Sequence, residues 1–133
     1  MELGRRKFVL ASVGTVAYAL CSSGEIVRGG SKMYGLIGKM KVADGKRDEL
    51  VKILLEGTDK MPGCLSYVIA NDPTDANAIW ITEVWDTKEN HAASLKLPSV
   101  QAAIAKGRPM ITGFGERFET EPVGGHGLSS KKA

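Results

Sequence analysis

Hydrophobic and polar residues alternate along four short segments of the chain, as in β-strands with one buried face. In 34–42 (YGLIGKMKV), Met40 and Val42 fall on one face. Lys39 and Lys41 fall on the other. The other three predicted strands are 64–70 (CLSYVIA), 78–85 (AIWITEVW) and 115–120 (GERFET).

A helix is predicted over 45–60, between the first two strands. Leu50, Ile53 and Leu54 recur at helical spacing and predict its buried stripe. Asp44 is expected to accept hydrogen bonds from the free N–H groups at its start. A Pro-Gly pair then ends it.

A second helical segment follows the third strand. Asp86 or Thr87 is expected to cap it, with Glu89 completing a capping box with Asp86. Pro98 is expected to interrupt the helix, which resumes over 99–107.

The predicted order is strand, helix, strand, strand, helix, strand. It matches the ferredoxin-like βαββαβ arrangement, an α+β fold with a four-stranded antiparallel sheet. The turn-rich loop 71–77 joins the second and third strands as an antiparallel pair. Both helices on one face leave the other face bare, which predicts a homodimer with sheets packed face to face. A solvated polar face is the alternative, and Lys39 and Lys41 favour it locally.

Residues 1–24 are predicted to be an export signal. Arg5-Arg6 precede the short apolar run 8–19, and Ala17-Tyr18-Ala19 matches an A-x-A cleavage site. The paired arginines resemble a twin-arginine signal, which predicts a periplasmic or extracellular protein without stable membrane insertion after cleavage. A basic leader without function is the alternative and would leave the protein cytoplasmic.

The segments beside the predicted domain, 33–121, carry little pattern. Residues 25–32 form a glycine-containing linker, and 122–133 a flexible tail that contains His126. Cys21 leaves open a lipid-modified terminus, although Leu20 precedes it where a small residue is usual.

Composition and charge argue against several classes of function. The chain has 133 residues, 43% of them hydrophobic, which suits one globular domain. Its net charge is +3, with several of the positive charges in the two tails. The near-neutral middle gives no basic stripe for nucleic acid. Two cysteines make neither a disulfide framework nor a metal cluster.

The core resembles the antibiotic biosynthesis monooxygenase domain, in its small quinol-monooxygenase-like branch. The segments that carry the resemblance are YGLIGKMKV, DGKRDELVKILL, PGCLSYVIANDP, WITEVWDTKENHAASLKLPSVQAAI and GFGERFETEPVGGHGL. The resemblance implies a dimeric α+β barrel with a cleft between sheet and helices in each subunit. It further implies that a quinol-like or polycyclic aromatic loses a proton there and reacts directly with O2, with no cofactor and no metal.

The candidate catalytic residue is His91, about one turn into the second helical segment. An imidazole titrates near neutral pH and could take a phenolic proton. Candidate substrate-binding residues are Trp85 as an aromatic wall, Tyr67 to orient a hydroxyl, and also Trp80 and Glu83. A solvated His91 on the helix surface remains open.

Structural roles also remain open for the other candidates. Trp85 and Trp80 could be core packing, and an inward-facing Glu83 could form a structural ion pair with Arg108 or Arg117.

Two further functions are alternatives to oxygenation. An exported dimer could bind a small aromatic ligand without chemistry. A haem-binding or haem-degrading relative is the other alternative. It conflicts with the first strand, which lacks the asparagine of haem-degrading relatives.

Overall fold

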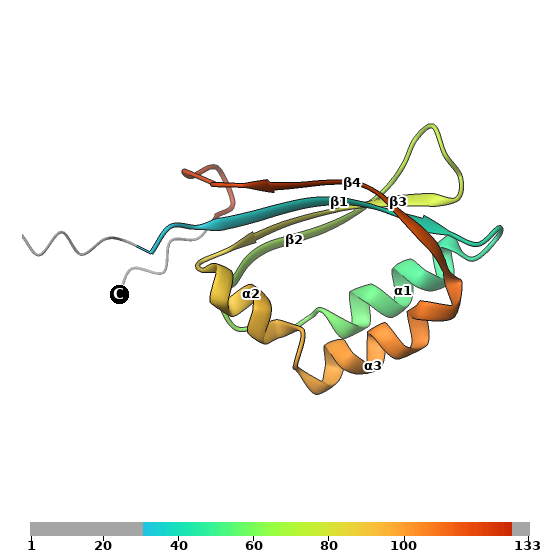
Figure 1. Ribbon diagram of the computed structural model, residues 1–133, viewed down its shortest axis with the longest axis horizontal. Coiled ribbons are helices and arrows are strands. Elements are labelled where there is room, and N and C mark those ends of the chain that lie inside the picture. The colour runs from blue at the N-terminus through green and yellow to red at the C-terminus, as the bar shows by residue number, and fades with distance from the viewer. Residues whose placement is uncertain (1–30, 129–133) are drawn as a thin grey trace, which may run out of the picture.

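The computed structural model describes residues 31–128, in which the helices lie together on one face of a four-stranded sheet (Figure 1). The elements are β1 (Tyr34–Val42), α1 (Arg47–Gly57), β2 (Cys64–Asn71), β3 (Ala78–Trp85), α2 (Lys88–Ser94), α3 (Pro98–Gly107), the 3-10 turn η1 (Arg108–Met110) and β4 (Ile111–Thr120). All paired strands are antiparallel, in the order β2-β3-β1-β4. The predicted ferredoxin-like α+β fold is confirmed, while the predicted leader and most of the linker lie outside the described residues.

The start of α1 differs from the prediction. The helix begins at Arg47, and no side chain caps it. The expected cap at Asp44 is wrong because the backbone closes this turn instead. The Lys46 N–H donates to the Ala43 carbonyl at 3.0 Å, and Gly45 adopts a φ of 70° that favours glycine.

The second helical segment is two separate helices. Thr87 caps α2, since its hydroxyl accepts a hydrogen bond from the Asn90 N–H at 3.1 Å. The segment ends at Ser94, and Pro98 is the first residue of α3. Proline suits this position because it lacks the N–H that a first-turn residue would leave unpaired.

Strand β4 starts at Ile111, four positions before the predicted Gly115. Two glycines interrupt the alternation at 113 and 115, which hides the first half of the strand from a pattern of side chains. Pairing with β1 also shifts register between Gly38 and Met40, so β4 carries an irregularity at this point.

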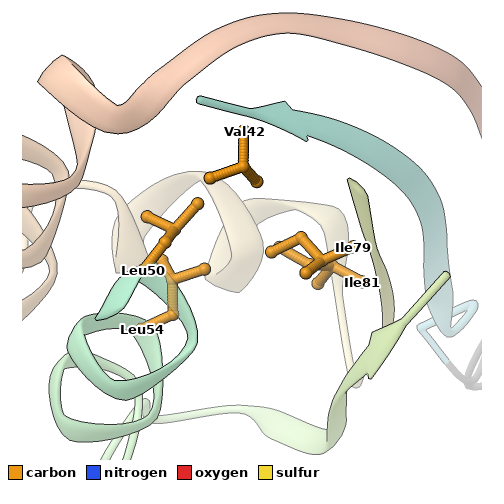
Figure 2. Close-up of a cluster of buried hydrophobic side chains, with 5 residues drawn as sticks. All are labelled: Val42, Leu50, Leu54, Ile79 and Ile81. Carbon is orange, nitrogen blue, oxygen red and sulfur yellow. The ribbon is translucent and has the colours of Figure 1, made fainter. Parts of the chain in front are cut away.

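The main core lies between the sheet and α1 (Figure 2). Leu50 and Ile79 are completely buried at its centre. The cluster of buried side chains consists of Val42, Leu50, Leu54, Ile79 and Ile81. None of the helices in residues 31–128 combines the length and apolarity needed to span a bilayer.

Asp72 organises the predicted loop between β2 and β3. Its Oδ1 accepts hydrogen bonds from the Thr74 N–H at 2.8 Å and the Asp75 N–H at 3.1 Å. Its Oδ2 lies 2.9 Å from both Lys39 Nζ and Trp80 Nε1. The loop is thereby tied to β1 and β3 by one buried carboxylate.

We expect Asp72→Asn to lose stability at neutral pH but not in strong acid. The Lys39 ammonium, then the Thr74 and Trp80 donors, hold the pKa of Asp72 well below its ordinary value of 3.8. A depressed folded-state pKa stabilises the protein above pH 3.8, and this contribution is lost as pH falls through the folded-state pKa. Urea unfolding at several pH values should show that the free energies of unfolding of the unmodified protein and of Asp72→Asn converge in acid. Exposed Asp48→Asn is the control. A difference in the free energy of unfolding that does not change with pH would contradict this assignment.

Candidate active site

A cavity of about 610 Å³ lies between the helix-facing side of the sheet and the helices. Most of its wall is apolar, and polar side chains enter it from β2 and β3. Its apolar lining includes Met40, Leu50, Leu54, Ile81, Leu95, Val100, Ala103, Ile104, Ile111 and Phe114. This size and character suit a small, largely apolar organic ligand.

Glu83 is the carboxylate of this wall. The strand alternation of β3 turns both Glu83 and Trp85 toward the helices. The Trp85 Nε1–H donates a hydrogen bond of 2.8 Å to Glu83 Oε2. The same oxygen lies 3.6 Å from His91 Nε2, and the Glu83 side chain is only 11% exposed. Glu83 therefore connects the cavity to His91.

Burial raises the pKa of Glu83 above its ordinary value of 4.5. The Trp85 donor, then His91 and Arg117, act in the opposite direction. A carboxylate with a raised pKa is a stronger base than one in water, so Glu83 is suited to receive a proton from a ligand in the cavity.

His91, on α2, is held between the aromatic rings of Tyr34 from β1 and Trp85 from β3. Its ring makes an edge contact with Trp85 at 5.5 Å between centroids and a tilted contact with Tyr34 at 5.1 Å. Its side chain is 13% exposed, so the alternative of a solvated surface imidazole does not hold. His91 is not among the residues that line the cavity, and its catalytic role stays a prediction.

Tyr67 lines the cavity from β2, directly across from Glu83. Burial first, and the Glu83 charge second, raise the pKa of the Tyr67 hydroxyl far above 10.0. The hydroxyl is therefore protonated at neutral pH. It is suited to donate a hydrogen bond to a bound oxygen atom, which is the role predicted for it.

The two tryptophans occupy opposite faces of the sheet. Trp85 is fully buried behind Glu83 and does not line the cavity. Trp80 lies on the other face, where its ring is 5.5 Å from Lys39 Nζ and its Nε1–H donates a hydrogen bond to Asp72. The structure therefore brings neither indole ring to the cavity wall, and their predicted substrate contact is not supported by position.

The arginines expected to pair with Glu83 take other positions. Arg108 lines the cavity from the turn after α3, and Arg117 lies 3.9 Å from Glu119. The direct partners of Glu83 among residues 31–128 are Trp85 and His91.

Three residues of the site were not predicted from the sequence. Tyr34 contacts His91 because β1 pairs with β3 so that Tyr34 lies opposite Trp85. Phe114 and Leu95 line the cavity although they are 73% and 46% exposed. Large apolar side chains exposed beside a cavity are a usable signal, but only once the fold is known.

Neither metal binding nor thiol chemistry is favoured by the side chains in the described part of the chain. Residues 31–128 contain no group of three His, Cys, Asp or Glu side chains placed to hold a metal ion. Burial raises the pKa of the half-buried Cys64 thiol, which favours the unreactive protonated form. His126 is exposed.

The fold and cavity define a ferredoxin-like α+β protein with an apolar cavity between sheet and helices. The family model for antibiotic biosynthesis monooxygenases matches residues 33–106, and the chain belongs to this family. A crystal structure from Chloroflexus aurantiacus J-10-fl, of a protein assigned to the same family, is 65% identical with a TM-score of 0.71. The match covers 73% of this chain and 99% of that one.

More distant structures share the fold. A family protein from Caulobacter crescentus CB15 is 21% identical, with a TM-score of 0.64 over 71% of this chain and 93% of that one. One from Nitrosomonas europaea is 15% identical, with a TM-score of 0.61 over 71% and 91%. The comparison with curated proteins finds no match.

Proposed function

We propose that the protein is a cofactor-independent monooxygenase that oxidises a quinol-like or polycyclic hydroxyaromatic with O2. The observation that carries the proposal is the Glu83 carboxylate, which has a raised pKa and stands in the wall of an apolar cavity of about 610 Å³. Membership of the monooxygenase family supports the same reaction type.

Proton removal is the step that this chain's residues would catalyse. A hydroxyaromatic becomes a much better electron donor to O2 once its O–H is ionised. Glu83 would accept the proton, while Tyr67 would donate a hydrogen bond to the resulting aryloxide oxygen. His91, 3.6 Å behind Glu83, favours the ionised carboxylate and thereby adjusts its basicity.

The proposed reaction balances without an external reductant. The ionised substrate donates electrons to O2, and a C–O bond forms at a ring carbon that carries two hydrogens in the keto form. The O–O bond then breaks, one oxygen stays as a carbonyl and the other leaves as water with both hydrogens. The substrate therefore supplies all four electrons.

Oxygen uptake with a panel of hydroxylated arenes tests the proposal. We expect one O2 consumed for each substrate oxidised, with no NADH, flavin or metal added. A well-folded protein that binds panel members but consumes no O2 would instead support a ligand-binding protein without chemistry.

Residues 1–24 support an exported location, which cell fractionation would test.

We further propose that the helix-free face of the sheet joins two copies of the chain. Cross-strand pairing places Phe118, Ile37, Thr82 and Val68 in one row across the four strands. Phe118 and Val68 are 54% and 53% exposed, and a second sheet would cover them.

Val68→Lys and Phe118→Lys are each expected to turn the dimer into a monomer, because a lysine buried there would lack a partner. Leu55→Lys changes an equally exposed apolar residue on α1 and should leave the dimer intact. Light scattering after size exclusion measures the state. A monomeric unmodified protein would rule out this interface.

A further inference from the structure

Gly38 occupies the middle of β1, on the side of the sheet that faces the helices. Its neighbours two positions away, Leu36 and Met40, both belong to the core on that side. Across the strand pair, Gly38 lies opposite Ile81, which is also buried there. A side chain at this position would therefore point between sheet and helices.

Neither backbone conformation nor packing in the protein explains this glycine. Gly38 is not among the residues with positive φ. A Cβ added to it would meet no atom within 4 Å. By contrast, a Cβ at Gly35 would lie 2.1 Å from Thr120 Oγ1, so close packing explains that glycine. A glycine inside a strand lowers stability, and one reason for it is the close approach of a ligand.

The open space above Gly38 adjoins the cavity. A second hollow of about 170 Å³ is lined by Gly38 and Arg117 among others. It shares four lining residues with the main cavity, namely Met40, Ile81, Glu83 and Phe114. The irregular pairing of β4 with β1 falls at this point. Glu83 therefore borders both spaces.

We propose that Gly38 is a specificity-determining residue, whose missing side chain admits a fused aromatic of two or three rings beside Glu83. The ring system lies flat over β1 at Gly38, against Met40 and Ile81, with its hydroxyl directed to Glu83. A single ring would leave the second hollow unused. This assignment of the substrate class rests on the proposed function of the same cavity.

The test compares the binding affinities of aromatic probes with one, two and three rings in the absence of O2. The probes are 1,4-dihydroxybenzene, 1,4-dihydroxynaphthalene and a dihydroxyanthracene, titrated calorimetrically under nitrogen. We expect Gly38→Val to weaken binding of the two- and three-ring probes by about tenfold or more, and of the one-ring probe by less than about threefold. Gly38→Ala, which adds one methyl group, should have an intermediate effect and provides the test if the valine variant does not fold.

Gly113→Val is the matched control. Its added side chain also meets no atom within 4 Å. The backbone of Gly113 borders the cavity, but its pairing with Lys41 directs a side chain to the opposite, helix-free face of the sheet. The inference is overturned if Gly38→Val weakens the binding of all three probes equally, or if Gly113→Val shows the same selectivity for ring size. It is also overturned if no probe binds to the unmodified protein. A clear ring-size effect without O2 consumption would instead refute the proposed oxygenation and leave the role of Gly38 standing.

Discussion

Replacing Glu83 by glutamine is expected to lower kcat/KM for a hydroxylated aromatic substrate by about a hundred- to ten-thousandfold. Glutamine keeps the size of the side chain, and its carbonyl oxygen can still accept the Trp85 N–H. The variant should therefore fold and bind ligand while lacking the proton acceptor. Exposed Glu56→Gln on α1 is the matched control and should keep full activity.

The pH profile separates Glu83 from His91 as the base. Activity requires ionised Glu83, so it should fall as pH drops through the raised pKa of this group, at a pH above 4.5. His91 lowers that pKa, so His91→Ala should move the acid limb of the profile to higher pH. If His91 itself is the base, its removal should cost about a hundredfold or more at every pH, and Glu83→Gln should cost less.

Trp85→Ala is expected to destabilise the protein by about 3–5 kcal/mol. The indole is completely buried, and its loss leaves a cavity beside Tyr34 and His91 and removes the hydrogen bond to Glu83. Chemical denaturation measures the loss.

Trp85→Phe is the companion variant. It keeps an aromatic ring and removes the N–H donor, so it should cost about 1–3 kcal/mol. A cost below about 1 kcal/mol for Trp85→Ala would show that this cluster does not support the fold or the orientation of Glu83.

The order of elements followed from the sequence because alternation and helical spacing are local properties. Strand β3 was predicted at its observed bounds, since β-branched and aromatic residues fill it without interruption. The first part of β4 was missed because Gly113 and Gly115 carry no side chain to alternate. Its pairing with β1, which defines the strand, is not encoded locally.

The site was predictable only to the level of which face each side chain occupies. Alternation along β3 puts Glu83 and Trp85 on one face of the strand, and the structure turns this face toward the helices. The approach of His91 to Glu83 depends on the turn before α2, and the contact of Tyr34 with His91 depends on the β1–β3 register. Neither distance follows from spacing along the chain. His91 was consequently preferred over Glu83 as the base.

The most direct measurement is the absorption spectrum of 1,4-dihydroxynaphthalene bound to the protein without O2. At neutral pH the unmodified protein should give the red-shifted band of the aryloxide, and Glu83→Gln the band of the neutral form. Admission of O2 should then bleach only the aryloxide complex. A neutral spectrum in the unmodified protein that nevertheless turns over, or an aryloxide band that survives Glu83→Gln, would contradict proton transfer to Glu83.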